Sequence, residues 1–245
     1  YVRQLRGLLK SCKANVALAP EEFMPFLQAA SENLDLLHVG AFEELHNVDA
    51  DAALPDAPGP EATAYLQYTS GSSQFPRGVV ITQRQVMQNL SSILCLGVQM
   101  RPDDRLVSWL PLYHDMGLVG FMLAPVTSQR SVDYLATRDF AMRPRQWLKL
   151  ISNNRGTIAF SPSFGYELCA RRIRHDATDF DLSSWRIAGA GAETIRPDSL
   201  MRFADTLKPA GFDAKAFLAC YGMAECALAI SFAPLDTGLT VDHLD

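Results

Sequence analysis

Apolar residues along this chain follow two spacings, and from residue 64 onward segments of the two kinds alternate. Short apolar runs at Ala64–Thr69 and Gly78–Thr82 predict two strands on either side of a Gly/Ser loop. Helical spacing then predicts helices over 83–96, 115–124, 143–154, 162–174 and 197–207. Strand-like runs lie between them at 105–110, 131–135, 157–160 and 185–190. This alternation predicts an α/β fold of layered, mostly parallel sheets flanked by helices, with ligands at the loops beyond the carboxyl ends of the strands.

The first 60 residues have a different character. Short amphipathic helical patterns place Leu5, Leu8 and Leu9 on one face and Phe23, Phe26 and Leu27 on another. Residues 49–60 are acidic and proline-rich and have no apolar periodicity, as expected of a linker. We therefore predict a first lobe with its linker over residues 1–60 and a main core over 61–245.

Composition excludes several classes of function. Of 245 residues, 48% are apolar and 20% charged, and the formal net charge is -5 without an evident basic face, so we expect no nucleic-acid partner. The five cysteines show no Cys-x-x-Cys spacing, which indicates free thiols rather than disulfides or a zinc site. Residues 1–7 lack the apolar run of a signal peptide, and Met116–Val126 is too short to cross a bilayer. We expect a cytoplasmic protein without a membrane span.

The loop between the first two predicted strands is rich in glycine and hydroxyl side chains. Its backbone N–H groups and hydroxyls are suited to hold a phosphate, with the charge of Arg77 at its far side. A polar hairpin loop without a ligand is the alternative. The Walker pattern does not fit this segment. The candidate phosphate-binding residues are Thr69, Ser70, Gly71, Ser72, Ser73, Arg77 and Gly78.

A second block, 109–118, follows a predicted strand and begins a predicted helix. It contains Pro111, His114 and Asp115. Asp115 is placed to cap the helix, which leaves His114 pointing from the loop. The alternative is a polar pair that is satisfied within the turn.

Two further blocks combine a strand end with small residues. In 185–193, Gly191 and Ala192 leave room for a flat aromatic base, although they are equally suited to a tight exit from a buried strand. In 221–226, Glu225 follows the aromatic Tyr221 within an apolar stretch. Such a lone glutamate is otherwise a surface residue or a paired core carboxylate.

The four blocks, in this order, resemble the signatures of the adenylate-forming superfamily, which includes acyl-CoA synthetases, luciferases and adenylation domains. The first resembles T-S-G-[ST]-[ST]-G-x-P-K-G, with Gln74 at the usual glycine and Arg77 at the usual lysine. The others resemble P-L-[FY]-H-D-x-G-L, a G-A-E turn and Y-G-x-[AT]-E-[TAS], with Cys226 at the last position. The resemblance spans essentially the whole chain and implies part of the N-terminal domain of these enzymes.

The resemblance also implies roles for individual residues. The first block would bind the phosphates of ATP, and His114 would lie beside the carboxylate and the acyl tunnel, so that Arg77, His114 and Glu225 are the candidate catalytic residues. Glu225 would hold the Mg²⁺ ion that screens the triphosphate while the carboxylate attacks the α-phosphorus. The candidate residues around the adenine are Gly191, Ala192, Glu193, Tyr221, Gly222 and Met223. Residues 61–245 would then be the ATP- and acyl-binding core.

Within the superfamily, the chain is most similar to fatty-acyl-AMP ligases, on the segments 66–70, 161–169, 191–193 and 241–244. This implies a ligase that activates a fatty acid to an acyl-adenylate, releases pyrophosphate and passes the acyl group to an acyl carrier protein. The alternatives are a fatty acyl-CoA synthetase and a degenerate module that binds nucleotide or acyl groups without catalysis. The C-terminal lid domain with its lysine is expected to be absent from these residues, and the isolated piece is expected to be poorly active.

The acyl tunnel is expected between the helix after His114 and residues 161–168. Its expected walls are Met116, Leu118, Phe121 and Met122 on one side and Phe164 and Tyr166 on the other.

Overall fold

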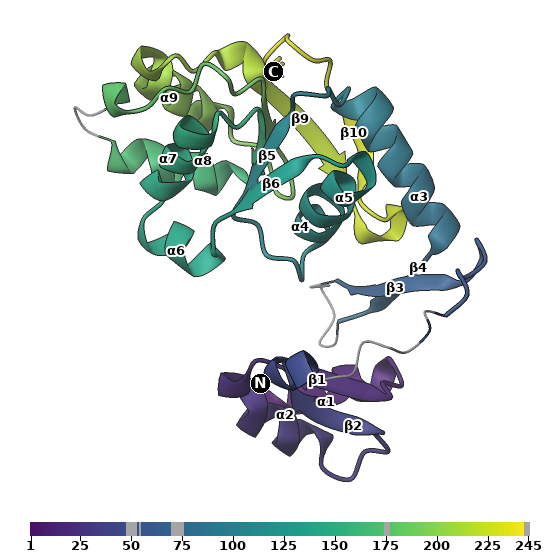
Figure 1. Cartoon of the computed structure of the whole chain (residues 1–245). Helices are drawn as coiled ribbons and strands as arrows, with labels where there is room; N and C mark the ends of the chain where they lie inside the picture. The colour runs from purple at the N-terminus through teal and green to yellow at the C-terminus, as the bar shows by residue number, and fades with distance from the viewer. Residues whose placement is uncertain (48–52, 54, 70–75, 174–176, 243–245) are drawn as a thin grey trace. The chain divides into compact units, whose positions relative to one another are not determined.

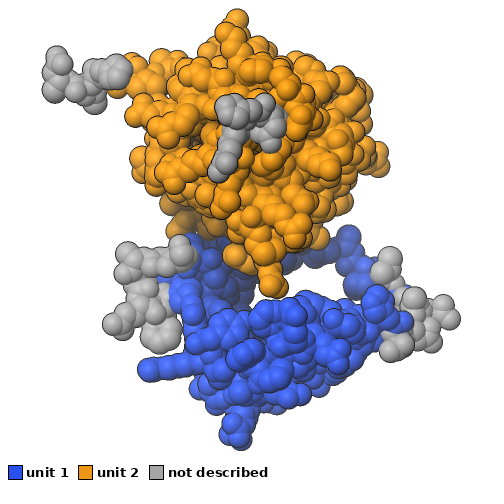
Figure 2. Space-filling view, turned by 90° about the vertical axis from the view of Figure 1, so that its left-hand side faces the viewer, with its two compact units in different colours: residues 1–83 blue, residues 84–245 orange. Residues whose placement is uncertain are grey.

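The computed structural model describes the chain except for residues 48–52, 54, 70–75, 174–176 and 243–245 (Figure 1). The chain divides into two compact units, residues 1–83 and 84–245, which Figure 2 shows in two colours. The predicted division into a first lobe over residues 1–60 and an ATP- and acyl-binding core over 61–245 is based on ligand binding, and it stays a prediction.

Unit 1 begins with helices and two short strands. In chain order these are α1 (Val2–Ser11), β1 (Val16–Ala19), the 3-10 turn η1 (Glu21–Phe23), α2 (Met24–Ser31), β2 (His38–Ala41) and the 3-10 segment η2 (Phe42–Asn47). β1 and β2 pair in parallel. Leu27 is buried, but Phe23 and Phe26, expected on the same apolar face, are 41% and 45% exposed. Because α2 begins only at Met24, Phe23 lies in the preceding turn and the helical spacing is broken.

The second part of unit 1 is the predicted hairpin. β3 (Thr63–Tyr68) and β4 (Gly78–Thr82) pair antiparallel, with Tyr68 opposite Gly78. The Thr69 N–H donates to the Arg77 carbonyl at 3.0 Å, so the pairing continues into the base of the loop. The Tyr68 hydroxyl forms a 2.5 Å hydrogen bond with the Ser11 hydroxyl, which ties the hairpin to α1.

Unit 2 is built on a six-stranded sheet in the order β10-β9-β8-β7-β5-β6. β5 (Arg105–Ser108), β6 (Ser131–Tyr134), β7 (Ile158–Ser161), β8 (Ile187–Ala190) and β9 (Phe217–Gly222) are parallel. β10 (Ala229–Phe232) pairs antiparallel with β9. The mostly parallel α/β fold is therefore confirmed, whereas β9 and β10 were not among the predicted strands.

Helices cover both faces of this sheet. On one face, α3 (Gln83–Ser92) continues into the π-helical segment η3 (Ile93–Gly97), and α4 (Asp115–Leu118), the π-helical η4 (Val119–Leu123) and α5 (Ala124–Ser128) form one continuous run. Figure 1 shows α6 (Thr137–Met142), α7 (Arg145–Asn154), α8 (Ser163–Arg172) and α9 (Pro197–Leu207) on the other side of the sheet. Short 3-10 turns are η5 (Ala177–Asp179), η6 (Lys208–Ala210), η7 (Ala214–Ala216) and η8 (Ala224–Cys226). Among the described residues, no helix combines the length and the hydropathy that a membrane crossing needs.

Buried aromatic rings fill the space between the sheet and α7–α9. Trp147 and Phe203 pack edge to face against Tyr166, which is fully buried, and Trp185 stacks on it. The Tyr166 hydroxyl donates to the Gly189 carbonyl at 2.8 Å, so the one polar atom of this ring is satisfied within the core. Tyr166 therefore belongs to the packing of unit 2 and not to the expected tunnel wall.

Candidate active site

The candidate motifs of unit 2 lie on neighbouring loops at one edge of its sheet. β5 leads into the segment with His114, β8 leads into Gly191–Glu193, and β9 ends at Gly222, just before Glu225. Because these strands are parallel, their carboxyl ends lie at the same edge, as the sequence predicts.

An apolar cavity of about 170 Å³ begins at this edge. His114, Ala192 and Tyr221 line its end at the carboxyl edge. Leu106 and Ile158, near the amino ends of β5 and β7, also line it, so the cavity runs along the strands. Nearly all other lining side chains are apolar, so a ligand inside would exchange water for hydrocarbon contacts.

The cavity agrees with one expected wall of the tunnel and differs from the other. Met116 and Phe121 line it as expected, whereas Leu118 and Met122, expected on the same wall, do not. Its opposite wall comes from η3, β9 and β10 rather than from Phe164 and Tyr166, because α8, which carries both of those residues, covers the other face of the sheet. The cavity therefore does not lie where residues 161–168 were expected to form a tunnel wall.

The His114 side chain is held by the residue that follows it. α4 begins at Asp115, so His114 occupies the N-cap position that was predicted for Asp115. The imidazole Nδ1 lies 2.8 Å from Asp115 Oδ1, and the Met116 N–H donates to the same oxygen at 2.7 Å. Met116 N also lies 3.2 Å from Nδ1, but a protonated Nδ1 donates to Asp115 and does not accept, so we assign the Met116 bond to the carboxylate.

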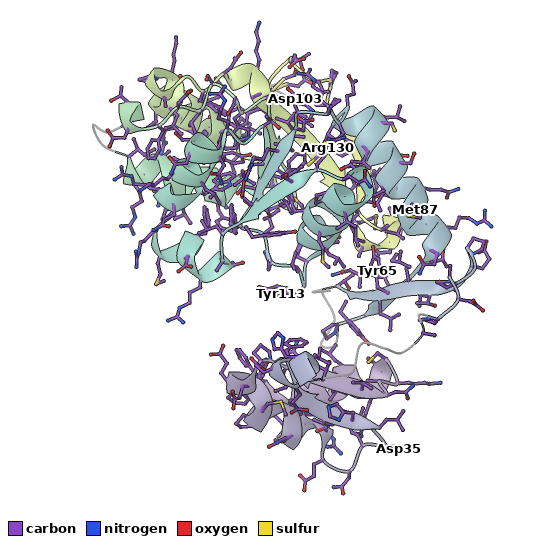
Figure 3. The ribbon with its side chains drawn as sticks, viewed as in Figure 1. Asp35, Tyr65, Met87, Asp103, Tyr113 and Arg130 are labelled. Atoms are coloured by element: carbon purple, nitrogen blue, oxygen red, sulfur yellow. The ribbon has the colours of Figure 1, made fainter. Side chains whose placement is uncertain are left out.

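Asp115 also controls the charge of His114. The hydrogen bond to its carboxylate, opposed by burial and assisted by charge attraction, raises the pKa of His114 above its usual value. With Nδ1 directed to Asp115, Nε2 remains as the ring atom that can contact a ligand. The preceding Tyr113 is 83% exposed on the same loop (Figure 3).

The turn after β8 depends on a glycine and a strained alanine. A Cβ at Gly191 would lie 2.7 Å from Cys220 Sγ and 2.8 Å from the Cys220 carbonyl oxygen, so no larger residue fits between β8 and β9. Ala192 has φ of 66°, in the left-handed region that residues other than glycine seldom adopt. The Glu193 carboxylate accepts from the Phe164 N–H at 3.0 Å in the first turn of α8. Glu193 therefore anchors this turn to a helix.

The loop after β9 presents an aromatic ring and a carboxylate. Tyr221 is 61% exposed, and a Cβ at Gly222 would lie 2.0 Å from the Leu228 carbonyl oxygen, so Gly222 allows the chain to reverse closely. Met223 follows it and is exposed, and its N–H donates to the same carbonyl at 2.8 Å. Glu225 is exposed in η8, and in the described part of the chain its carboxylate has no hydrogen bond or ion pair.

Glu225 fits one role in metal binding. The described residues contain no group of three or more His, Cys, Asp or Glu side chains that could hold a metal by themselves. Mg²⁺ is usually bound by one or two carboxylates together with substrate phosphates and water. An exposed, unpaired carboxylate such as Glu225 matches that requirement.

The predicted phosphate-binding residues belong to unit 1. Thr69, Arg77 and Gly78 form the base of the hairpin loop, where Arg77 is exposed and has no acceptor among the described residues. Predictions for four further positions lie outside the described residues, namely Ser70, Gly71, Ser72 and Ser73.

Sequence reasoning missed much of the cavity wall. Ile93, Cys220, Leu228 and Phe232 line it, yet in the sequence they are indistinguishable from ordinary core residues. One signal was present: Gly120 interrupts an apolar helical pattern, and a glycine in such a position often marks a close approach or an open space. Here a Cβ at Gly120 would have Leu228 Cδ2 as its nearest neighbour, at 3.6 Å.

Several known proteins are similar to this chain in sequence. A protein of Caulobacter vibrioides with a provisional acyl-CoA synthetase name is 45% identical over 246 residues, which cover 100% of this chain and 43% of that protein. The medium-chain-fatty-acid–[acyl-carrier-protein] ligase TtuA of Teredinibacter turnerae is 37% identical over 198 residues, 78% of this chain and 30% of that enzyme.

Solved structures are also similar to this chain. A structure from a study of fatty acyl-adenylate ligases of E. coli and L. pneumophila matches with a TM-score of 0.93 and 52% identity, over 98% of this chain and 44% of that one. The chain thus spans less than half the length of these relatives. Residues 2–243 match the family described as AMP-binding enzyme, and the chain belongs to this family.

Proposed function

We propose that the protein activates a fatty acid with ATP, forming an acyl-adenylate and releasing pyrophosphate. The observation that carries this proposal is the narrow apolar cavity that runs from His114 and Tyr221 along the strands of the sheet. Pockets for drug-sized ligands are typically roughly 300 to 1,000 Å³. The volume of about 170 Å³ suits a slender aliphatic chain better than a bulky ring system. Similar proteins named as fatty-acid and fatty acyl-adenylate ligases support the same substrate class.

In this reaction, a carboxylate oxygen of the fatty acid attacks the α-phosphorus of ATP. A bond forms between that oxygen and the phosphorus, while the bond from the α-phosphorus to the bridging oxygen breaks and pyrophosphate leaves with the electron pair. His114 is placed at the carboxyl end of the cavity, where its Nε2 can donate to the carboxylate or to an α-phosphate oxygen. A protonated imidazole there would stabilise charge that develops on these oxygens.

Other residues would hold the nucleotide. The exposed ring of Tyr221 would stack on the adenine, with Gly222 and Met223 beside it and with Gly191, Ala192 and Glu193 forming the neighbouring border. Magnesium, when bound, supplies positive charge that screens the triphosphate, and Glu225 would be its protein ligand. Thr69, Ser70, Gly71, Ser72, Ser73, Arg77 and Gly78 would bind the phosphates.

The acceptor of the acyl group is the second part of the proposal. We infer that the acyl-adenylate passes its acyl group to the phosphopantetheine thiol of an acyl carrier protein, and the name of the T. turnerae relative supports this acceptor. Thiolate attack on the acyl carbon would release AMP. The name of the C. vibrioides relative favours coenzyme A as the alternative acceptor. Supplying the adenylated enzyme with a pantetheinylated carrier protein or with coenzyme A, and measuring AMP release, separates the two.

Pyrophosphate release tests the adenylation step. The protein of full natural length is incubated with ATP, Mg²⁺ and fatty acids of rising chain length. We expect release that depends on both the fatty acid and Mg²⁺, and Glu225→Gln should lower its rate by about 100-fold, because it removes the charge that holds the metal without changing the size of the side chain. Asp205→Asn, on the exposed surface of α9, is the matched control and should leave the rate unchanged. A Glu225→Gln protein with the wild-type rate would contradict the role of Glu225.

A further inference from the structure

Asn89 connects two parts of unit 2 that lie 140 residues apart in the sequence. Its side-chain Nδ2 donates to the Ala229 carbonyl at 2.8 Å. Its Oδ1 accepts from the Ala229 N–H at 3.0 Å. One carboxamide on α3 thus satisfies both backbone groups of a single residue on β10.

Ala229 occupies a sensitive position. It is the first residue of β10 and lies opposite Gly222, the last residue of β9. The Met223 N–H donates to the Leu228 carbonyl at 2.8 Å, so residues 223–228, with η8 and Glu225, form a loop that is closed at its base by these pairs. Whatever fixes Ala229 fixes the returning end of this loop.

Among the strands that the structure describes, β10 stands at one edge of the sheet and has a strand neighbour on one side only. The backbone groups on that side need other hydrogen-bond partners when they are shielded from water. The Asn89 carboxamide supplies both partners at Ala229, an N–H donor from Nδ2 and an acceptor in Oδ1. The ladder is also irregular between Ala229 and Ser231, so regular pairing alone does not hold the strand here.

The helix that carries Asn89 is itself a firm support. Its neighbours Val86 and Leu90 are 5% and 2% exposed. The π-helical continuation η3 packs so closely on β10 that a Cβ at Gly97 would lie 2.6 Å from the Phe232 ring. A side chain fixed on α3 can therefore hold the loop in one place.

We propose that Asn89 is a positioning residue for the reaction: by holding Ala229, it fixes the loop that carries Glu225, without contacting the substrates. This inference rests on the proposed function, because it concerns the placement of the carboxylate that would bind the metal. It also assigns a role to a residue outside the four motifs. Loss of the bond should loosen the loop, and a misplacement of about 1 Å at a catalytic group can cost on the order of 100-fold in rate.

Two substitutions at Asn89 test this. Asn89→Asp keeps size and shape, but it replaces the donor with a carboxylate oxygen that faces the Ala229 carbonyl. Asn89→Ala removes both hydrogen bonds. For both variants we expect a kcat at least about 10-fold below that of the wild type and a higher Mg²⁺ concentration for half-maximal pyrophosphate release. In a Glu225→Gln background, Asn89→Ala should have little further effect, since the two residues act through the same group.

Two controls separate positioning from loss of stability. Gln88→Ala changes an exposed amide on the same helix and should be neutral. Leu90→Ala weakens the packing of α3 while leaving the Asn89 carboxamide in place, and well below its melting temperature it should keep the wild-type Mg²⁺ dependence. If Leu90→Ala reproduces the Asn89 effect, or if both Asn89 variants fold and keep kcat and Mg²⁺ dependence within twofold of wild type, the proposal is wrong.

Amide hydrogen exchange gives a readout that does not need activity. The Ala229 and Met223 amides should exchange at least about 10-fold faster in Asn89→Ala than in wild type, because one loses its acceptor and the other loses its fixed partner strand. If the wild-type protein releases no pyrophosphate with any fatty acid, the proposed function fails. Unchanged exchange of both amides in Asn89→Ala would overturn the inference about Asn89 whether or not the protein is active.

Discussion

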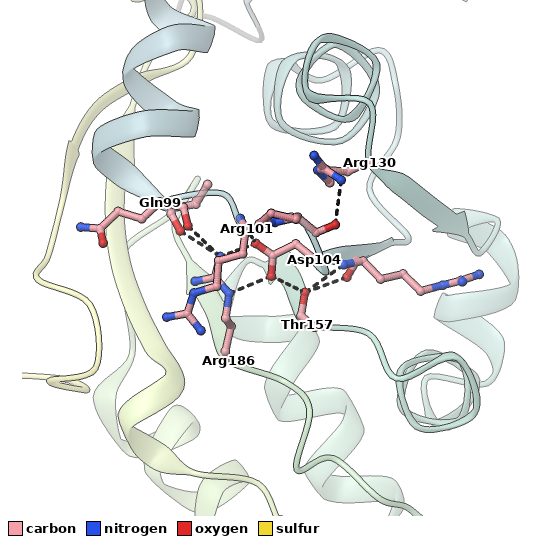
Figure 4. A network of polar contacts seen from close by, with 9 residues as sticks. Gln99, Arg101, Asp104, Arg130, Thr157 and Arg186 are labelled. Carbon is pink, nitrogen blue, oxygen red and sulfur yellow. Dashed lines mark hydrogen bonds and ion pairs between the residues drawn. The ribbon is translucent and has the colours of Figure 1, made fainter.

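The two edges of the six-stranded sheet in unit 2 differ in whether their charged and polar side chains are paired within the protein. At the amino edge, Asp104, Thr157 and Arg186 directly precede β5, β7 and β8 and form a single network (Figure 4). Arg186 donates to the two Asp104 carboxylate oxygens at 2.8 and 2.5 Å, and Thr157 Oγ1 donates to one of them at 2.8 Å. Asp104 is only 5% exposed.

The carboxyl edge has the opposite character. Tyr221 and Glu225 are exposed, and His114 has one ring nitrogen paired with Asp115 and the other directed elsewhere. Hydrogen-bonding groups at this edge are therefore available to a ligand, whereas those of Asp104 and Arg186 are already used inside the protein. The same sheet is therefore held together at one edge and is open to ligands at the other.

The largest effect on stability is expected when the carboxylate at the amino edge is removed. Asp104→Ala leaves the Arg186 guanidinium, whose side chain is 14% exposed, without its charged partner. Breaking a buried ion pair from one side typically costs about 3–5 kcal/mol of stability. We expect a loss of this size in the free energy of unfolding measured in urea, with unchanged specific activity in the fraction that remains folded.

Asp103→Ala is the matched control for that measurement. Asp103 is the neighbouring acidic residue and is exposed (Figure 3). Surface substitutions of this kind usually change stability by less than about 0.5 kcal/mol. If the two variants lose equal stability, or if Asp104→Ala lowers activity before it unfolds, the amino edge is not the purely structural region that we describe.

The contribution of Asp104 to stability should also depend on pH. Burial disfavours the charged form of Asp104, but hydrogen bonds from Arg186, the Arg101 backbone and Thr157 outweigh it, and its pKa is lowered. A lowered folded pKa means that Asp104 stabilises the fold fully above its unfolded pKa of about 3.9, and that this contribution is lost as pH falls through the folded value. The stability difference between wild type and Asp104→Asn should therefore be smaller at pH 2.5 than at pH 7. A constant difference in urea unfolding would contradict this assignment.

Local patterns in the sequence predicted the elements that alternate regularly and the loops that carry the motifs. The strands at 105–110, 131–135, 157–160 and 185–190 are confirmed to within a few residues, because each is a short apolar run bounded by polar residues. β9 was not among the predicted strands, because its apolar run continues into the Tyr221-Gly222 motif without a polar residue to mark its end. β10 is an edge strand with a mostly exposed pattern, so its sequence has no clear alternation.

The cavity could not be derived in the same way. Which face of the sheet a helix covers depends on the order and handedness of the connections, and one sequence does not give the strand order. The sequence therefore placed the tunnel next to α8, whereas the cavity lies on the other face of the sheet. The Asn89–Ala229 bond, between residues 140 positions apart, likewise has no local signal. The sequence could predict that the site residues lie on loops, but it could not predict the distances between them.

A substitution that fills the cavity tests whether the carboxyl edge of the sheet binds the acyl chain. The nearest atom to a Cβ at Gly120 is Leu228 Cδ2 at 3.6 Å, so Gly120→Leu should extend into the cavity without a clash at its first atom. Each buried methylene contributes about 0.8 kcal/mol, or roughly fourfold in affinity, so the preferred acyl chain should become shorter. The measurement is kcat/KM for pyrophosphate release over a series of fatty acids.

Gly165→Trp provides the contrast. A Cβ at Gly165 would lie 2.1 Å from Ser161 Oγ and 2.9 Å from the Trp109 ring, so this change should destabilise the fold and leave chain-length preference unaltered. A stable Gly120→Leu variant with wild-type preference would show that the acyl chain lies elsewhere.

The smallest expected effect concerns the protonation of His114. Asp115→Asn removes the carboxylate that raises the pKa of His114, and the pKa should fall toward its usual value of about 6.5. The sign follows from linkage: a raised folded pKa gives stability that is complete below the unfolded pKa and is lost as pH rises through the folded one. Because about half of the His114 side chain is exposed, we expect a small change in stability and a clear one in titration, measured by NMR of the ring protons.

If the protonated ring contacts the carboxylate or phosphate, kcat/KM should decline as pH rises through this pKa, and in Asp115→Asn the decline should begin at lower pH. An unchanged pKa in the variant would mean that Asp115 caps the helix without controlling the charge at the open edge of the sheet.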